Sequence, residues 1–177
     1  MHIVTLPTPS LRERSKEVDR DFLSAKKTQE FIDELIAEMY RDDGVGIAAP
    51  QVGNNVRICV IGKDILPKGF IIPGIAEYKK QDFILVNPEW EKTSKKLAWD
   101  TEGCLSVPEI FGKVQRYKDI SVKIWDRTGK EHSFKAEAFF ARAIQHEVDH
   151  LDGILFVDKA KDLYHYDKTK NETTPLV

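Results

Sequence analysis

Apolar residues near the N-terminus recur with the spacing of a helix. Between Thr28 and Asp42 they return with a period close to 3.6, which predicts an amphipathic helix. Thr28 is placed to cap the start of this helix, and Gly44 is placed to end it. The apolar face consists of Phe31, Ile32, Leu35, Ile36, Met39 and Tyr40.

The middle of the chain carries strand-like patterns. Residues 56–62 (VRICVIG) and 83–88 (FILVNP) are short, apolar and rich in β-branched side chains, so each predicts a buried strand. Residues 65–81 have no such pattern, and we interpret them as an irregular loop. Between residues 119 and 136, apolar and polar positions alternate on both sides of the turn sequence DRTG, which predicts a β-hairpin.

A second helix is predicted for residues 136–151, with Gly153 placed to terminate it. Residues 162–177 are polar and are expected to fray. The chain has no internal repeat and no linker, so we expect one domain over residues 1–177. The fold class that we expect is α+β: antiparallel β-sheets packed around the C-terminal helix, with the amphipathic helix near the N-terminus.

Charge and composition narrow the classes of function. The formal net charge is −2, which gives no basis for a direct nucleic-acid site or for attraction to an anionic membrane. The sequence contains no apolar run of membrane-spanning length, and its first residues lack the pattern of a secretion signal. The two cysteines, Cys59 and Cys104, form no disulfide framework, so we expect reduced thiols in a cytoplasmic protein.

The second predicted helix carries the motif H-E-x-x-H. His146 and His150 are four residues apart, so both imidazoles face the same side of the helix and can bind one metal ion. From the next position, Glu147 can reach a water on that metal without being a ligand. This combination is typical of metal-assisted hydrolysis. The alternative is a helix with two solvated histidines and a surface glutamate, and the placement of the motif on a predicted helix favours the metal site over it.

A third protein ligand has several candidates. The extended zinc-protease motif H-E-x-x-H-x-x-G-x-x-H would place a histidine at Phe156, which cannot bind a metal. A second protease family uses a downstream glutamate, but Glu172 lies in the polar tail. The remaining histidines are isolated, and Cys59 lies in a continuous apolar run where a cysteine is usually a buried hydrophobe. On chemistry alone, Cys104 is favoured as the ligand over a structural or free role.

Three separated blocks resemble the peptide deformylase family. They are GVGIAAPQ at 44–51, EGCLS at 102–106 and QHEVDH at 145–150, in the order and spacing of that family. The resemblance extends from the first residues to about Asp158. Three motifs in order are far more specific than H-E-x-x-H alone.

The resemblance implies a set of catalytic residues. Cys104, His146 and His150 would hold one divalent metal, most commonly Fe²⁺ in the family, with Zn²⁺, Ni²⁺ or Co²⁺ able to replace it. Glu147 would be the general base and then the acid that protonates the leaving amine. The backbone N–H of Leu105 and the side-chain amide of Gln51 would bind the formyl oxygen, so these two residues and Glu147 form the expected catalytic set.

The same resemblance implies how the substrate binds. The bare backbone at Val45 and Gly46 would pair with the substrate peptide like an added strand, and Gly103 would permit a close backbone approach. The methionine side chain would enter a pocket lined by Phe139, Arg142 and Ala143. Arg116 and Asp149 resemble a structural ion pair of the family.

The implied function is hydrolysis of the N-formyl group from new polypeptides that begin with formyl-methionine, with release of formate. The implied setting is the bacterial cytoplasm, with a monomeric enzyme that touches the ribosome transiently. Two other functions remain open: a zinc endopeptidase, which would cleave unformylated peptides, and a non-catalytic metal-binding or peptide-binding module. The presence of both Glu147 and Gln51 favours the deformylase.

Overall fold

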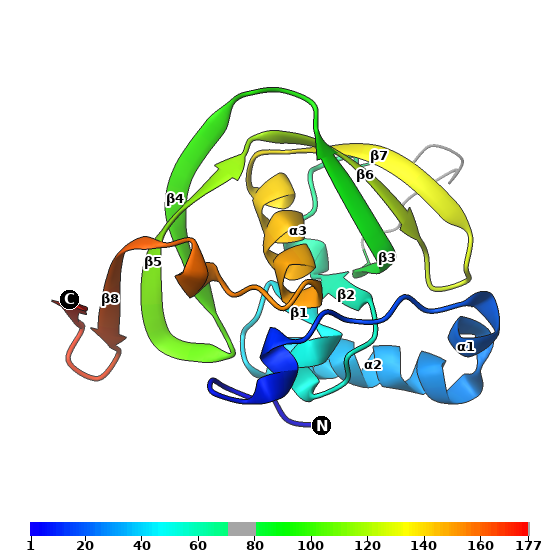
Figure 1. Cartoon of the computed structure of the whole chain (residues 1–177), viewed down its shortest axis with the longest axis horizontal. Helices are drawn as coiled ribbons and strands as arrows, with labels where there is room; N and C mark the ends of the chain where they lie inside the picture. Colours follow the sequence, from blue (N-terminus) through cyan, green and yellow to red (C-terminus); the bar gives the residue numbers. More distant parts are fainter. Residues whose placement is uncertain (71–80, 177) are drawn as a thin grey trace.

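The computed structural model describes residues 1–70 and 81–176. In Figure 1, α3 (Ala138–Leu151) lies at the centre, with β4 and β5 on one side and β3, β6 and β7 on the other. All paired strands of the described residues run antiparallel, so the α+β prediction is confirmed. One sheet has the order β1 (Gly46–Ala48), β2 (Ile58–Ile61), β3 (Phe83–Lys92), β6 (Asp119–Trp125) and β7 (Glu131–Glu137). The other has the order β4 (Leu97–Cys104), β5 (Val107–Tyr117), β8 (Lys161–Asp167) and β9 (Glu172–Pro175).

Two helices precede the first sheet. The predicted amphipathic helix is α2 (Lys26–Arg41), which follows the short α1 (Arg20–Ser24). Its N-cap is Ala25, and Thr28 is buried inside the helix, so the predicted cap was wrong. Short 3₁₀ turns connect the remaining elements: η1 (Pro9–Arg12), η2 (Ala49–Val52), η3 (Lys63–Ile65) and η4 (Phe156–Asp158). None of the described helices is long and apolar enough to cross a membrane.

The main core forms where the first sheet packs on α3. The inward positions of the predicted hairpin β6–β7 are buried, and Val122 pairs with Phe134 in register. Phe140, Ile144 and Val148 supply the apolar side of α3 that meets this sheet. Because buried apolar area is the main favourable term in folding, this face fixes the rotation of α3 about its axis. The opposite side of α3 is therefore turned toward the second sheet.

The sequence patterns did not predict the second sheet. Residues 97–117 form a long antiparallel pair, β4 and β5, for which no strand was predicted. The exposed residues of β4 include Leu97 and Trp99 as well as charged side chains, and glycine interrupts both strands, so neither strand has a clear alternation of apolar and polar positions. The polar tail does not fray, because β8 pairs with β5 and Tyr164 stacks on Phe111 at 5.8 Å between ring centroids. Residues 71–80 of the predicted loop lie outside the described residues.

Candidate metal centre and active-site cleft

The predicted metal ligands meet at the side of α3 that faces the second sheet. His146 and His150 lie one helical turn apart, with ring centroids 5.0 Å from each other. The last residue of β4 brings Cys104 to the same place, with its Sγ 3.2 Å from Nε2 of His150. One ligand atom from each of the three residues lies within 4.8 Å of the others.

The donor atoms of this cluster fit a divalent transition metal. A thiolate and two neutral imidazoles form a ligand set suited to iron, zinc, nickel or cobalt. His146 uses Nδ1 to contact Oε2 of Glu102 at 2.9 Å, which leaves Nε2 for a metal. Such an outer hydrogen bond fixes the tautomer of a ligating histidine. Burial lowers the pKa of His150 well below its ordinary value, so its ring is in the neutral form that a metal requires.

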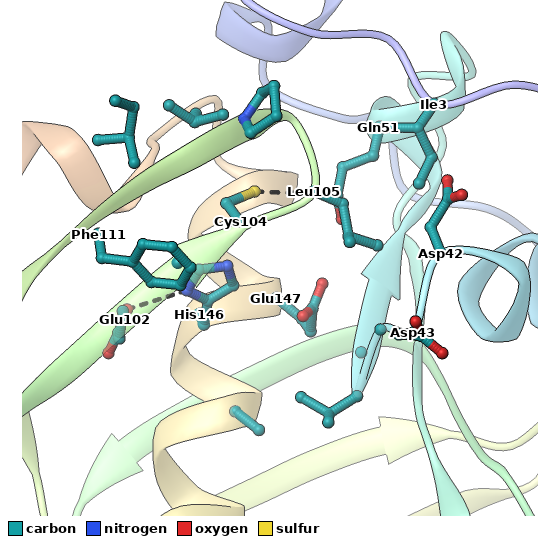
Figure 2. Close-up of a pocket in the computed structure, with 18 of the residues that line it drawn as sticks. Ile3, Asp42, Asp43, Gln51, Glu102, Cys104, Leu105, Phe111, His146 and Glu147 are labelled. Atoms are coloured by element: carbon teal, nitrogen blue, oxygen red, sulfur yellow. Dashed lines mark hydrogen bonds and ion pairs between the residues drawn. The ribbon is translucent and has the colours of Figure 1, made fainter. Parts of the chain in front are cut away.

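Glu147 lies beside the cluster and is almost fully enclosed. Its side chain lines the same cleft as Cys104, and its Oε2 has no hydrogen-bond partner among the described residues (Figure 2). Burial raises the pKa of Glu147 to about 7, although the nearby His146 opposes this shift. A carboxyl group with a pKa near neutrality can accept a proton and return it under cellular conditions.

A close contact with β1 defines the place of Glu147. A methyl group on Gly46 would sit 2.4 Å from Oε1 of Glu147, where real side chains essentially never approach. Any side chain at position 46 would therefore displace the Glu147 carboxylate from the place it occupies. The block GVGIAAPQ at 44–51 therefore has a second predicted role besides pairing with substrate, because its Gly46 leaves room for the Glu147 carboxylate.

The side chain of Gln51 has a defined orientation at the edge of the cluster. Its Oε1 accepts a hydrogen bond from the backbone N–H of Ala48 at 2.9 Å, which turns Nε2 toward Cys104 and Ser106. Nε2 lies 3.5 Å from Sγ of Cys104 and 3.3 Å from Oγ of Ser106. Leu105 occupies the turn between β4 and β5 and lines the same cleft as Gln51.

These groups open into one cleft of about 670 Å³. All of the residues predicted to bind substrate line it: Val45, Gly46, Gly103, Phe139, Arg142 and Ala143. Phe139 is half exposed at 50%, whereas Ala143 is buried. β1 is the terminal strand of its sheet, so its outer edge is available for pairing. The cleft therefore brings together a candidate metal site, a carboxylate, an oriented amide and a free strand edge.

Comparison with known proteins agrees with this site. The model of the polypeptide deformylase family matches residues 1–165. The chain belongs to the peptide deformylase family. A peptide deformylase from Nautilia profundicola is 42% identical over 165 residues, which cover 90% of this chain and 85% of that protein. One from Halothermothrix orenii is 43% identical over 159 residues, which cover 90% of this chain and 92% of that protein.

Solved deformylase structures share the fold. A class I type b peptide deformylase from Acinetobacter baumannii superposes with a TM-score of 0.79 at 33% identity, over 91% of this chain and 98% of that one. Peptide deformylase 1B from Arabidopsis thaliana, in complex with an inhibitor, gives 0.77 at 36% identity over 92% and 82% of the two chains. The family resemblance seen in the three sequence blocks is therefore confirmed. Deformylases are metal-dependent hydrolases, and the Cys104 cluster is where this member could hold its metal.

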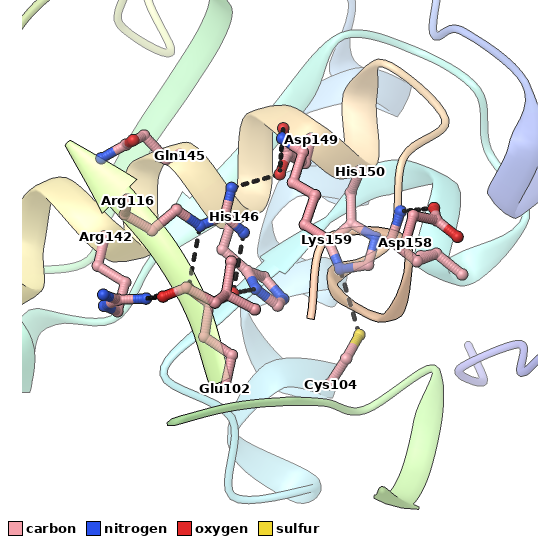
Figure 3. A network of polar contacts seen from close by, with 12 residues as sticks. Glu102, Cys104, Arg116, Arg142, Gln145, His146, Asp149, His150, Asp158 and Lys159 are labelled. Carbon is pink, nitrogen blue, oxygen red and sulfur yellow. Dashed lines mark hydrogen bonds and ion pairs between the residues drawn. The ribbon is translucent and has the colours of Figure 1, made fainter. Parts of the chain in front are cut away.

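The sequence interpretation missed the part that Glu102 plays in a buried charge network behind the candidate metal site (Figure 3). Glu102 receives two hydrogen bonds from Arg116, at 2.9 and 2.8 Å, and one from Arg142 at 2.5 Å. Although burial opposes ionisation, the hydrogen bonds from Arg116 and His146 lower the pKa of Glu102 below its ordinary value. Glu102 is therefore a fixed carboxylate that orients His146. Only its position two residues before Cys104 could have suggested this role.

The charged end of Arg142 belongs to this network, although the residue also lines the cleft. Its guanidinium donates to Glu102 and to the carbonyls of Val114 and Ala98, at 3.0 and 2.8 Å. Only its aliphatic stem is left to face the cleft, because the charged head is held between β4 and β5. The ion pair between Arg116 and Asp149, expected from the family resemblance, is present. Lys159 adds a second cation to Asp149 at 2.7 Å.

Proposed function

We propose that the protein removes the N-formyl group from the N-terminal formyl-methionine of new polypeptides and releases formate. The main observation in support of this proposal is that the ligand atoms of Cys104, His146 and His150 cluster beside the buried carboxylate of Glu147. Family membership supports the same reaction.

In this proposal, Cys104, His146 and His150 hold one divalent metal ion. When bound, the metal supplies Lewis acidity, which polarises the formyl carbonyl and lowers the pKa of water. Glu147 accepts a proton from the attacking water and then delivers it to the leaving amine. Its pKa of about 7 supports both steps at neutral pH.

Two neutral donors stabilise the negative charge that develops on the formyl oxygen. These are Nε2 of Gln51, whose direction is set by the bond to Ala48, and the backbone N–H of Leu105. One such donor is worth about 3 kcal/mol in transition-state stabilisation. Because neither donor is charged, neither competes with the metal for its ligands.

The substrate enters as an extended peptide along the outer edge of β1. Its main chain pairs with Val45 and Gly46, and it passes close to the bare backbone at Gly103. The methionine side chain fits between Phe139, Ala143 and the stem of Arg142, all of which line the cleft. Arg142 contributes carbon surface alone in this role, since its guanidinium is engaged with Glu102.

We also propose the setting of the reaction. The physiological metal is Fe²⁺, with Zn²⁺, Ni²⁺ or Co²⁺ as functional replacements, because the Cys-His-His set accepts all four. The enzyme acts as a monomer in the bacterial cytoplasm and contacts the ribosome transiently. Bacterial relatives support this setting.

The test is formate release from a formyl-methionyl tripeptide, using protein purified without oxygen and assayed beside its metal content. We expect formate in proportion to bound metal and no cleavage of the unformylated tripeptide. The variant Cys59→Ala serves as a control, because Cys59 is buried in β2 and is not one of the three residues whose ligand atoms cluster. Fully metallated protein that releases no formate would overturn the proposal, and cleavage of unformylated peptide would support the endopeptidase instead.

A further inference from the structure

We propose that the C-terminal hairpin, β8 and β9 with the turn between them, positions one wall of the cleft through Phe111. Tyr164 and Tyr166 act as positioning residues that hold the ring of Phe111. That ring covers Gly103, beside which the substrate peptide passes. The inference rests on the proposed function and adds an element to its binding cleft. The family match ends at residue 165, so Tyr166 and all of β9 lie outside it.

Phe111 lies in a row of residues that crosses three neighbouring strands of the second sheet. It pairs with Gly103 of β4 on one side and with Tyr164 of β8 on the other. A Cβ added to Gly103 would lie 2.6 Å from Cε1 of Phe111, so the ring occupies the space beside the missing side chain. Glycine weakens a strand because it has no side chain to pack, and an aromatic neighbour compensates for this. Phe111 therefore restrains the strand at Gly103.

The hairpin holds the ring of Phe111 from the side away from β4. Tyr164 stacks on this ring, with centroids 5.8 Å apart and an angle of 21° between the planes. Tyr166 meets it edge-on, with centroids 6.2 Å apart. The hydroxyl of Tyr166 donates a hydrogen bond to Oδ1 of Asn171 at 2.9 Å, which fixes this second ring on the turn of the hairpin. The position of Phe111 thus depends on two rings that both come from β8.

β8 packs closely against β5 beside Phe111 (Figure 1). A Cβ on Gly112 would lie 2.8 Å from Cδ2 of Leu163, so the glycine at this position lets β8 approach. Leu163 packs against the buried cluster that contains Phe156, and its carbonyl accepts a hydrogen bond from the N–H of Leu176 at 2.8 Å. The hairpin is therefore tied to the core and can serve as a fixed support.

This arrangement reaches the cleft at two places. Phe111 and Gly103 line the cleft, and so does Lys168 from the turn between β8 and β9. Figure 2 shows Phe111 on the side of the cleft opposite Gln51. Among the described residues β4 is the terminal strand of its sheet, so its outer edge is available for pairing with a peptide. Glu147 belongs to α3, so loss of the hairpin contacts should weaken peptide binding and spare the chemical step.

The experiment measures kcat and KM separately for formate release from a formyl-methionyl tripeptide. Tyr164→Leu removes the stacked ring and keeps apolar bulk, whereas Tyr164→Phe keeps the ring. Phe111→Leu and the double variant with Tyr164→Leu complete a double-mutant cycle. The matched control is Tyr117→Leu, which removes a ring contact of similar length, 5.9 Å to Trp90, outside the set of residues that line the cleft. Metal content and urea unfolding are measured for each variant.

We expect Tyr164→Leu to raise KM by about two- to tenfold, the range that one aromatic pair supplies, and to leave kcat nearly unchanged. Tyr164→Phe and the Tyr117→Leu control keep the KM of the unchanged protein. Once Phe111→Leu is present, Tyr164→Leu adds no further increase, because it acts through that ring. Tyr166→Leu raises KM in the same way, and it takes the place of Tyr164→Leu if that variant does not fold.

Three results would overturn the inference. An unchanged KM in the folded Leu variants would mean that the hairpin does not position the wall. An equal increase with and without the ring of Phe111 would mean that Tyr164 acts by another route. A fall in kcat together with a loss of metal would mean that the hairpin supports the strand of Cys104 instead. If the unchanged protein released no formate, the proposed function itself would fail, and peptide binding to the same variants would still test the hairpin.

Discussion

Replacement of Gly46 by alanine tests whether Glu147 is held in its working position by β1. The added methyl group would lie 2.4 Å from Oε1 of Glu147 and 3.0 Å from Cδ. Ordinary contact begins near 3.4 Å, so the carboxylate must retreat by about 1 Å. The φ of Gly46 lies outside the left-handed region, so the backbone at residue 46 can accept alanine. The only cost of the substitution is therefore the steric clash between the added methyl group and Glu147.

The expected loss follows from that displacement. A reacting group that is misplaced by about 1 Å costs roughly 100-fold in rate. Overpacking a filled site also costs about 1–3 kcal/mol in the free energy of unfolding. We therefore expect Gly46→Ala to lower kcat on a formyl-methionyl peptide by about 100-fold, while metal content stays at the level of the unchanged protein.

Gly53→Ala is the matched control. Gly53 has a φ of 77° with nothing within 4 Å of the position of its Cβ, so alanine there strains the backbone without touching the site. That strain costs about 1 kcal/mol and leaves kcat unchanged. Formate release, metal analysis and urea unfolding are measured for both variants. A Gly46→Ala enzyme within threefold of full activity would refute the view that the contact with β1 defines the position of the base.

The remaining predictions concern the ligands and the charge network. Glu147→Gln keeps its metal, as measured by elemental analysis, and loses turnover by roughly 1,000-fold, because a base and not a ligand is removed; full activity would contradict its role. Cys104→Ala loses metal, whereas Cys59→Ala retains it, since burial raises the pKa of the Cys59 thiol and holds it in the protonated form; the reverse pattern would identify the other cysteine as the ligand. Glu102→Gln lowers the free energy of unfolding of the metal-free protein by about 3–5 kcal/mol at pH 7. Because the pKa of Glu102 is lower in the folded protein than its ordinary value of 4.5, its stabilisation is present above that pH and is lost as the pH falls below it. The gap between the two proteins in urea unfolding should therefore narrow from pH 7 to pH 3.5, and a constant gap would show that another group is responsible.

The site shows why some residues were predictable and others were not. The face shared by His146 and His150 follows from the helical repeat, which is a local property of the chain. Gln51 and Leu105, the proposed oxyanion donors, were suggested only by motifs that resemble a family. Glu102 has no local pattern that marks it, since its function depends on a helix more than forty residues away.

Periodicity in the sequence by itself determined the amphipathic helix α2, the hairpin β6–β7, the helix α3 and the pair of histidines on one face of α3. These features depend on which side chains avoid water, and the repeat of a helix or strand records that along the chain. Tertiary structure alone decided that β4 and β5 form although neither has a regular alternation of apolar and polar positions, and that β8 holds the polar tail in place. It also decided that Cys104 reaches His150, that Gly46 leaves room for Glu147, and that the guanidinium of Arg142 turns away from the pocket toward Glu102. Such contacts join segments far apart in the chain, so they depend on the packing of α3 between two sheets and not on local spacing.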